Sequence, residues 1–313
     1  MEQKILGLLN EKYALKIQKV EAVTNEMFRC IANEGEFFAR VTNYKNYEEQ
    51  LEEVNYTSYL HKRGFGVSPV ITSINGKVVE NIPIDGRELL TVLYQAAPGI
   101  HLPRKQWDAD VLKELGRQIG KLHHLSKQYE DKHPVKYIRD WHENEEYAFH
   151  KYIPKEETTI RNIAEEVVTT IKKLPKSTFN YGLLHGDLWL GNILVDKDLK
   201  LTMVDFQDCE KHFYIFDLAV PIYSAVEYSF VGGGNISDYR QQITQAIIKG
   251  YQEENTLSIE MIDQLPLFIK LKEIFEYSLM HMYWDQDKLT ENEIRIMNHF
   301  RMRIEHDHSF LGA

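Results

Sequence analysis

The residues best suited to chemistry lie in one short stretch of the chain. Asp187 is followed five residues later by Asn192, and Asp205 follows after a further thirteen. Two apolar runs, 193–195 and 201–204, flank a polar turn between them, which predicts a β-hairpin. Because a hairpin brings its outer ends together, we expect Asn192 and Asp205 at one edge, with Asp187 in the loop just upstream.

These three side chains have the chemistry that phosphoryl transfer requires. Mg²⁺ prefers oxygen ligands and is commonly held by one or two carboxylates together with substrate phosphates, so Asn192 and Asp205 are the predicted metal ligands. An acceptor hydroxyl needs a base that orients it and takes its proton, and Asp187 is the predicted base. His185 is expected to support the loop from inside. The pattern H-x-D-L-x-x-x-N, then D-F, matches kinase signatures; the alternative is that these groups only cap local backbone.

The remaining sequence predicts two lobes, as expected for 313 residues at roughly 150 residues per domain. Short β-prone runs surround one helix over 47–62, which predicts a mostly antiparallel sheet carrying one helix. These runs are 20–30, 36–41, 68–74, 78–82 and 89–94. After Ala97-Pro98-Gly99 helical periodicity dominates. The expected helices are 108–129, 141–150, 156–173, 237–254 and 260–285.

Charge and composition exclude several classes of protein. Acidic residues number 47 against 37 basic ones, a net charge of −10 that argues against nucleic acid or an anionic membrane as partner. No apolar run approaches the about 18 residues of a membrane-spanning helix, and the N-terminus lacks a signal-peptide core. Cys30 and Cys209 are far apart and form no metal motif, so a reducing cytoplasm is the expected location.

The stretch 183–219 resembles the aminoglycoside phosphotransferase, choline kinase and homoserine kinase type II superfamily, the small-molecule branch of the protein-kinase-like fold. The likeness rests on His-Gly-Asp in place of H-R-D and on Phe216-Asp217-Leu218-Ala219, which is similar to the family's D-[IL]-A element. An A-P-E activation segment is missing after Asp205. Outside this stretch the resemblance covers only the order of the elements.

The resemblance implies an α+β, bilobal protein-kinase-like fold. Residues 1–95 would form the N-terminal nucleotide-binding lobe, and residues 96–313 the helical lobe that carries catalysis and substrate binding. The implied activity is Mg²⁺- and ATP-dependent phosphorylation of a small-molecule hydroxyl, on an aminoglycoside, an amino alcohol or a sugar-like acceptor. GTP is the alternative donor, and no oligomeric state is predicted.

Nucleotide-binding residues are also carried over from the resemblance. Arg40 stands where the strand pattern V-A-I-K has lysine, and a guanidinium can hold phosphate in a forked geometry. Its expected partner on the helix is Glu53, with Glu52 and Glu49 as alternatives.

Two further contacts with the nucleotide are implied. Thr24 and Asn25 lie in a polar turn without G-x-G-x-x-G and are expected to donate to phosphate, with a plain β-turn as the alternative. The backbone groups of Gln95 and Ala96 are expected to hold the adenine edge. A P-loop is excluded because G-x-x-x-x-G-K-[ST] is absent, and the run 232–234 of three glycines is interpreted as a plain loop.

The acceptor is expected to meet the helical lobe. Aromatic and acidic residues there suit a cationic amine, through carboxylate pairing and cation–π contact, although ordinary helix surface is the alternative for most of them. They are Tyr147, Phe149, Glu273, Glu276, Tyr283, Trp284, Asp285 and Asp287. Trp189 in the catalytic loop is expected to border the acceptor or to be part of the core.

Two other functions compete with a small-molecule kinase. A protein kinase of the same fold is disfavoured because the activation segment is missing. A catalytically inactive nucleotide sensor is favoured by Arg40 and by the missing glycine-rich loop, but Asp187, Asn192 and Asp205 are all present, which argues against it.

Overall fold

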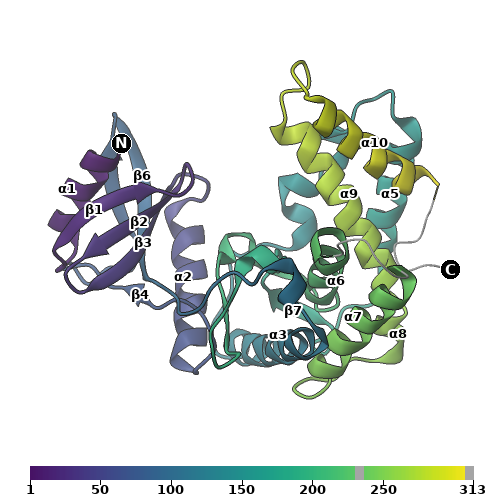
Figure 1. Cartoon of the computed structure of the whole chain (residues 1–313), viewed down its shortest axis with the longest axis horizontal. Helices are drawn as coiled ribbons and strands as arrows, with labels where there is room; N and C mark the ends of the chain where they lie inside the picture. Colours follow the sequence, from purple (N-terminus) through teal and green to yellow (C-terminus); the bar gives the residue numbers. More distant parts are fainter. Residues whose placement is uncertain (230–235, 307–313) are drawn as a thin grey trace. The chain divides into compact units, whose positions relative to one another are not determined.

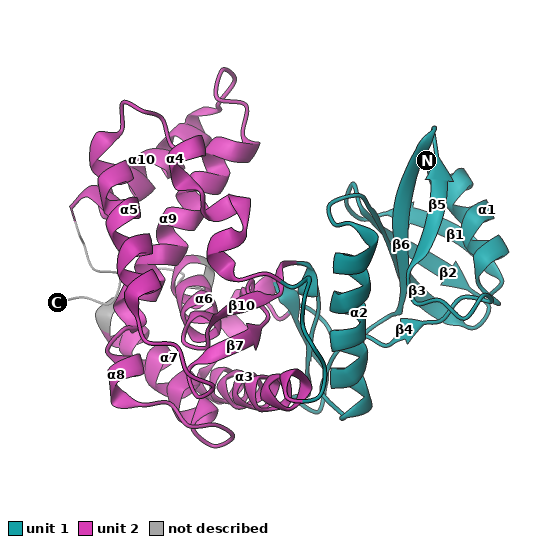
Figure 2. Cartoon of the chain, turned by 180° about the vertical axis from the view of Figure 1, so that it is seen from behind, with its two compact units in different colours: residues 1–101, 132–138, 192–207 teal, residues 102–131, 139–191, 208–313 magenta. Residues whose placement is uncertain are grey.

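The computed structural model of the chain describes residues 1–229 and 236–306. The chain divides into two compact units, each built from segments that are separate in the sequence (Figure 2). Unit 1 comprises Met1–His101, Lys132–Ile138 and Asn192–Gln207, and unit 2 comprises Leu102–Asp131, Arg139–Gly191 and Asp208–Ala313. A single boundary between residues 95 and 96 does not describe this interleaving, and the assignment of functions to two lobes stays a prediction.

Unit 1 is built around an antiparallel sheet (Figure 1). Its strands are β1 Ile17–Ala22, β2 Met27–Ala32, β3 Gly35–Thr42, β4 Val70–Ile71, β5 Glu80–Ile84 and β6 Arg87–Gln95, and its helices are α1 Glu2–Lys12 and α2 Tyr47–Lys62. The strand order is β1-β2-β3-β6-β4, and β5 also pairs with β6. The expected run 20–30 is two strands, because a turn closed between Val23 and Met27 divides it. The expectation of one helix was wrong, since α1 is a second helix.

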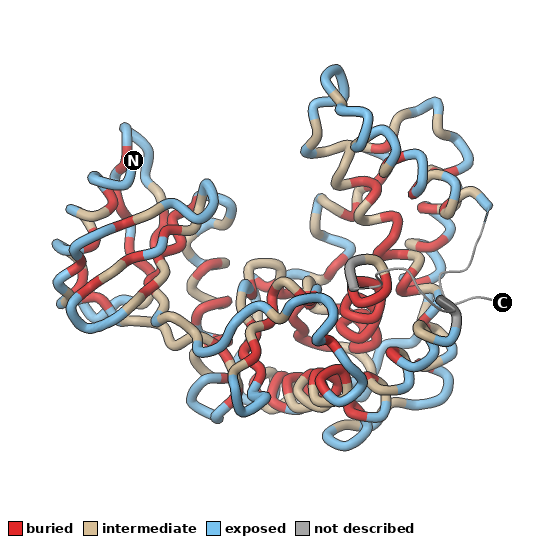
Figure 3. The backbone as a smooth tube through the Cα atoms, in the orientation of Figure 1, coloured by how far each residue is buried: buried red, intermediate tan, exposed pale blue. Residues whose placement is uncertain are grey.

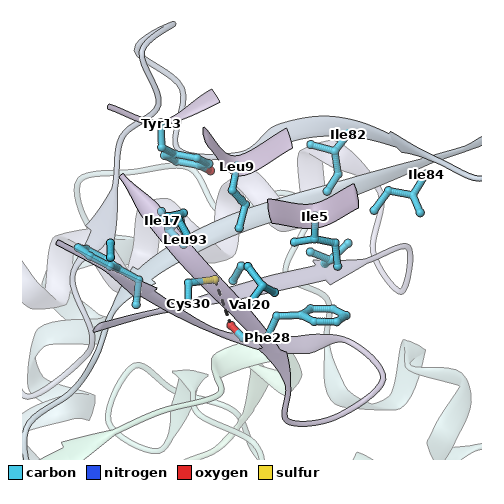
Figure 4. Close-up of a cluster of buried hydrophobic side chains, with 14 residues drawn as sticks. Ile5, Leu9, Tyr13, Ile17, Val20, Phe28, Cys30, Ile82, Ile84 and Leu93 are labelled. Carbon is cyan, nitrogen blue, oxygen red and sulfur yellow. Dashed lines mark hydrogen bonds between the residues drawn. The ribbon is translucent and has the colours of Figure 1, made fainter. Parts of the chain in front are cut away.

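The two helices of unit 1 cover opposite faces of the sheet, because successive side chains of a strand point to opposite faces. On one face Ile5 and Leu9 of α1 join a buried cluster that includes Leu93 of β6 (Figure 4). On the other face Val54 of α2 packs with Val92, the neighbour of Leu93 in the same strand. Each face of the sheet therefore has its own apolar core.

Two segments that are distant in the sequence are bound to the rest of unit 1 by hydrogen bonds from their backbone N–H groups. The carboxylate of Glu52 in α2 accepts from the N–H groups of residues 136–138, at 2.8, 2.5 and 2.6 Å. The predicted hairpin is confirmed as β8 Ile193–Val195 and β9 Leu201–Met203, which pair antiparallel. The N–H of Met203 donates to the carbonyl oxygen of Gly66 at 2.8 Å, and a Cβ at Gly66 would lie 2.1 Å from a carbonyl oxygen of β9.

Unit 2 is mainly helical, with one two-stranded ribbon of β7 and β10. Its elements are α3 Ala109–Glu130, α4 Phe149–Tyr152, α5 Thr158–Lys173, β7 Tyr181–Leu184, β10 Glu210–Phe213, α6 Phe216–Ser224, α7 Ile236–Tyr251, α8 Ile259–Ile262, α9 Leu265–Tyr283 and α10 Glu291–Glu305. Short 3-10 helices occur at η1 Arg104–Gln106, η2 Trp141–Glu143, η3 Glu145–Tyr147, η4 Leu190–Asn192 and η5 Phe206–Asp208, and a π-helical turn at η6 Ala225–Ser229. Helix α6 is buried along its whole length (Figure 3).

Two helix expectations for unit 2 differ from the structure, and one helix of unit 2 has no counterpart among the expectations. The expected helix 141–150 is broken because the side chain of Asn144 accepts from the N–H of Glu146 at 3.1 Å and starts a new turn. The expected helix 260–285 is two helices, and Pro266 lies in the first turn of the second. Helix α10 was not expected.

In the described part of the chain, no helix has the length and apolar character needed to cross a membrane.

Candidate active site

The loop that carries Asp187 leaves the ribbon at the end of β7, where Leu184 pairs with Glu210 of β10. Its second residue, Gly186, has a φ of +86°, and a Cβ there would lie 2.2 Å from the carbonyl oxygen of Asp208. Only glycine fits both the left-handed backbone and this close approach. The glycine of the H-G-D sequence is therefore required by the backbone conformation of the loop.

A buried carboxylate fixes the backbone of this loop. Asp217, in the first turn of α6, accepts from the N–H groups of His185 and Gly186 at 2.9 and 3.0 Å. His123 Nε2 lies 3.1 Å from the same carboxylate, and His123 Nδ1 lies 3.0 Å from the hydroxyl of Tyr251. Burial lowers the pKa of His123 more than the nearby Asp217 raises it, so the ring is a neutral hydrogen-bonding partner. The D-[IL]-A element thus positions the loop, while His185 is fully buried beside it.

Asp187 is in contact with a lysine from a distant helix. Lys272 of α9 places its Nζ 3.2 Å from Asp187 Oδ1 and 2.8 Å from Glu276 Oε1. The side chain of Lys272 is only 4% exposed, and that of Asp187 is 29% exposed. Burial alone would lower the pKa of Lys272, but Glu276 and Asp187 outweigh it and raise this pKa, so the lysine is charged. No local pattern in the sequence marks Lys272 as a residue of the site.

Asn192 and Asp205 lie in unit 1, at the open end of the hairpin. Asn192 directly precedes β8, and the N–H of Val204 donates to its carbonyl oxygen at 3.0 Å. Asn192 is 9% exposed, whereas the side chain of Asp205 is 48% exposed and its backbone is left-handed, with a φ of +61°. Within residues 1–229 and 236–306 no three His, Cys, Asp or Glu side chains gather as a metal site. One carboxylate and one amide fit Mg²⁺, whose remaining ligands are commonly phosphates and water.

Neighbouring residues of a strand point to opposite faces of the sheet. Ala39 of β3 belongs to the core on the α1 face, so Arg40, the next residue, lies on the α2 face. Its Nη2 donates to Glu53 Oε1 of α2, and its Nη1 lies 3.8 Å from Asp205 Oδ1. The other oxygen of Glu53 is held by Lys45 Nζ at 2.9 Å and by the side chain of Gln50 at 3.1 Å. Burial alone would raise the pKa of Glu53. The positive charges of Arg40 and Lys45 outweigh this effect and hold the pKa of Glu53 below its ordinary value.

One donor of this cluster is unsatisfied. Arg40 Nε is buried and has no hydrogen-bond partner among the described residues. A buried donor without a partner costs free energy, so an anion bound here would stabilise the site. The Arg40 position therefore fits a phosphate group, and the exposed Asp205 beside it fits a cation.

The turn between β1 and β2 is closed by its own side chain. Thr24 Oγ1 accepts from the N–H groups of Glu26 and Met27 at 3.2 and 3.0 Å. This is the geometry of a plain β-turn, and the hydroxyl of Thr24 keeps its own hydrogen for donation. Asn25 is exposed at the tip of the same turn.

The backbone N–H groups expected at the adenine edge are already engaged within unit 1. The N–H of Gln95 donates to the carbonyl of Pro69 at 2.9 Å, and that of Ala96 donates to the carbonyl of Glu36 at 3.0 Å. A contact with adenine through these residues would therefore use their carbonyl oxygens. The glycine run 232–234 lies outside the described residues.

A cavity of about 610 Å³ lies in unit 2, between α9, α10 and the π-helical turn. Its polar and aromatic walls include Glu227, Glu276, Tyr283, Trp284, Arg295 and His299. Three residues expected to meet the acceptor, Glu276, Tyr283 and Trp284, are thus brought together.

Other residues expected near the acceptor have different surroundings. Tyr147 and Phe149 are buried in the core of unit 2. Glu273 is also buried and is ion-paired with Lys270 and Arg303. Asp285 pairs with Lys288, and Asp287 is exposed. Trp189 is 41% exposed, and its ring lies against Gly191.

Comparison with known proteins gives a consistent assignment. The model of the phosphotransferase enzyme family (APH) matches residues 16–242. Amicoumacin kinase of Bacillus subtilis (strain 168) is 27% identical over 310 residues, which cover 97% of this chain and 92% of that protein. The structure of amicoumacin kinase hAmiN in complex with AMP-PNP, Ca²⁺ and Ami matches 98% of this chain and 93% of that chain, with a TM-score of 0.90 and 27% identity.

A more distant structure supports the same fold. The microcompartment-associated aminopropanol kinase matches 97% of this chain and 95% of that chain, with a TM-score of 0.75 and 18% identity. The chain described here therefore belongs to the phosphotransferase enzyme family and is a small-molecule phosphotransferase with a protein-kinase-like fold.

Proposed function

We propose that this enzyme transfers the γ-phosphoryl group of ATP, with Mg²⁺, to a hydroxyl of a small molecule that also carries a cationic amine. The observation that carries the proposal is the 3.8 Å approach of Arg40 to Asp205. A metal–nucleotide complex needs a cation for its phosphates and a carboxylate for its metal at neighbouring positions. The AMP-PNP and Ca²⁺ bound to hAmiN support a nucleoside triphosphate and a divalent metal.

In this proposal the residues of unit 1 bind the metal–nucleotide complex. Asn192 and Asp205 would hold the metal, which neutralises phosphate charge when bound. Arg40, fixed by Glu53, would contact the phosphates, with Thr24 and Asn25 as further donors from the turn. The roles of Arg40, Glu53, Thr24 and Asn25 suit residues 1–95 as the nucleotide-binding lobe, to which Asn192 and Asp205 of the hairpin add the metal ligands.

In the proposed complex the base of the nucleotide lies at the end of strand β6. The carbonyl oxygens of Gln95 and Ala96 accept hydrogen bonds, so they suit the amino group of adenine better than the carbonyl group of guanine. We therefore propose ATP rather than GTP as the donor. Initial rates with each nucleotide, at equal concentration, test this choice.

Asp187 is assigned the role of base. The acceptor oxygen forms a bond to the γ-phosphorus, the bond from that phosphorus to the bridging oxygen breaks, and ADP leaves with the electron pair. The hydroxyl proton passes to the carboxylate of Asp187. Asn192 is five residues from Asp187, so the chain keeps the two within roughly 17 Å.

For the acceptor we propose the cavity of unit 2. Glu276 and Glu227, each of which is also paired with a basic side chain, supply carboxylate oxygens, and Tyr283 and Trp284 supply aromatic faces, a combination that suits an ammonium group attached to an apolar body. Amicoumacin, named for the relatives at 27% identity, is the first acceptor to test. We also propose a cytoplasmic location, which suits the buried free thiols of Cys30 and Cys209.

An ADP-release assay with amicoumacin, amino alcohols, aminoglycosides and sugars tests this function, with the phosphorylated product identified by mass spectrometry. Asp187→Asn should still bind ATP and lose about 10²–10⁴-fold in turnover. Asp205→Asn should lose metal-dependent nucleotide binding. Wild-type affinity for Mg-ATP in Asp205→Asn would contradict the metal assignment, and ATP binding without turnover on any acceptor would favour the sensor.

A further inference from the structure

We propose that Lys272 is a positioning residue for Asp187, pairing with the carboxylate and orienting it for the acceptor hydroxyl; this inference rests on the proposed function. Its geometric basis is the double contact of Lys272 Nζ, at 3.2 Å to Asp187 Oδ1 and 2.8 Å to Glu276 Oε1. Helix α9 is thereby joined to the catalytic loop, which is 85 residues away in sequence.

The surroundings of Lys272 make its charge important for Asp187. Two other carboxylates face the pair: Glu276 from α9 and Glu146 from η3, whose charge acts on both Lys272 and Asp187. The ring of Phe275 lies 5.1 Å from Lys272 Nζ on another side. Without the lysine, the negative charges of Glu276 and Glu146 would no longer be offset beside Asp187, in a partly dry environment.

The consequence for the reaction is a base that is fixed in place. Lys272 is shared by direct contact between Asp187 and Glu276, whereas burial, the largest effect, raises the pKa of Glu146. When Asp187 takes the hydroxyl proton, Lys272 keeps the carboxyl group in place. Loss of this contact would affect the catalytic step and not the binding of ATP.

Glu276 gives the same lysine a link to the proposed acceptor site. Its carboxylate lines the cavity of unit 2 and contacts Lys272, so the cavity wall and the base are separated by one side chain. The wall of the cavity and the base are therefore joined through two successive ion pairs, Glu276 with Lys272 and Lys272 with Asp187. This arrangement distinguishes Lys272 from a lysine that only stabilises the fold.

Lys270, on the same helix, provides a matched control. Its Nζ binds Glu273 at 3.3 Å and the carbonyl oxygens of Arg303 and Ile304 at 3.1 Å, so it fastens α9 to α10 without contacting Asp187 in any of these bonds. Replacement of either lysine by methionine removes a mostly buried charge. Only replacement of Lys272 should change the chemistry.

The test compares Lys272→Met, Lys272→Arg and Lys270→Met by pH–rate profile and by Mg-ATP titration. For Lys272→Met we expect kcat to fall about 100-fold, as for a displaced catalytic group. The acid limb of its profile should move about one pH unit upward, because the base is protonated more easily beside like charges. The Kd for Mg-ATP should stay within about twofold, since ATP binding is assigned to unit 1. Lys272→Arg should recover most of the rate, and Lys270→Met should lower the melting temperature alone.

Further variants separate failure of this inference from failure of the proposed function. If Asp187→Asn is inactive while Lys272→Met has wild-type kcat and an unchanged acid limb, the positioning role is wrong and the proposed base stands. If Asp187→Asn keeps full activity, the proposed base is itself wrong. Asp187→Asn with Lys272→Met should be little worse than Asp187→Asn alone, because the two act as one unit. If Lys272→Met does not fold, Lys272→Gln, whose neutral amide can still donate a hydrogen bond, takes its place, and the same profile decides.

Discussion

Arg40 and Glu53 form an ion pair inside unit 1, with side chains that are 3% and 1% exposed. Removing two charges from water is costly, and additional hydrogen bonds to the pair offset part of that cost. Lys45 and Gln50 complete the hydrogen bonds of Glu53. The forked guanidinium reaches toward Glu53 and Asp205 at once through two nitrogens, which the single ammonium of a lysine does not offer. This gives a physical reason for arginine at the strand position.

Replacing Arg40 by methionine should destabilise the protein as well as weaken nucleotide binding. Because the variant leaves Glu53 buried with fewer partners, we expect its free energy of unfolding in urea to fall by about 3 kcal/mol. The double variant Arg40→Met with Glu53→Met should lose less, since no buried charge is stranded. A double variant that is less stable than Arg40→Met would contradict this account of the pair.

The sequence predicts those parts of the site that local patterns determine. The hairpin between Asn192 and Asp205 follows from two apolar runs around a polar turn, and its main-chain pairing is observed. The pairing of Arg40 with Glu53, expected from the family resemblance, is also observed, and the roles of both residues in nucleotide binding stay predictions. The hairpin could be predicted from a pattern within about twenty residues, whereas the Arg40–Glu53 pair could be predicted only from the resemblance to a known fold.

Contacts between distant segments were not predictable. Lys272 contacts Asp187 only because of the way α9 packs within unit 2. The residues next to Lys272 in the sequence have the pattern of an ordinary helix. The engagement of the Gln95 N–H likewise depends on where residue 69 lies. Helix α10 had a local signal that was overlooked, the capping box formed by Thr290 and Glu293.

Gly186→Ala should damage the catalytic loop more than other glycine substitutions with similar φ. The new Cβ would lie 2.2 Å from the carbonyl oxygen of Asp208, so the loop must move and carry Asp187 with it. We expect turnover to fall about 100-fold and stability to fall by about 1–3 kcal/mol. Gly64→Ala is the matched control: its φ is +71°, but no atom lies within 4 Å of the new Cβ. Equal losses in both variants would show that φ alone, and not the close contact, matters at Gly186.

Asp217→Asn should separate the support of the catalytic loop from its chemistry. The amide keeps one acceptor oxygen but cannot serve His185, Gly186 and His123 together, so at least one buried N–H loses its partner. The expected loss of unfolding free energy is about 2 kcal/mol, accompanied by a lower kcat because the Asp187 loop loosens. Hydrogen exchange at the His185 and Gly186 amides should become faster. Unchanged exchange at these amides would contradict the role of Asp217, and the exposed Asp263→Asn is the control.

Glu210→Gln should make the protein more stable at alkaline pH. Glu210 is buried on β10, and burial first, then the nearby charges of Asp208, Asp217 and Glu146, raises its pKa well above the ordinary value despite the hydrogen bond from Tyr147. The native state therefore holds a proton that the unfolded chain releases above about pH 4.5, so stability is full below that pH and decreases as the pH rises toward the folded-state pKa.

Glutamine cannot titrate, yet its oxygen can still accept the hydrogen bond of Tyr147, which is 2.9 Å long in the native enzyme. We therefore expect equal stability of wild type and Glu210→Gln near pH 4, and a gain of at least about 1 kcal/mol for the variant at pH 8, measured by urea unfolding at both values. Glu156→Gln, at an exposed position, should show no such gain. A constant difference between Glu210→Gln and wild type at all pH values would mean that Glu210 titrates alike in the folded and unfolded chains, since only a difference in proton binding makes stability depend on pH.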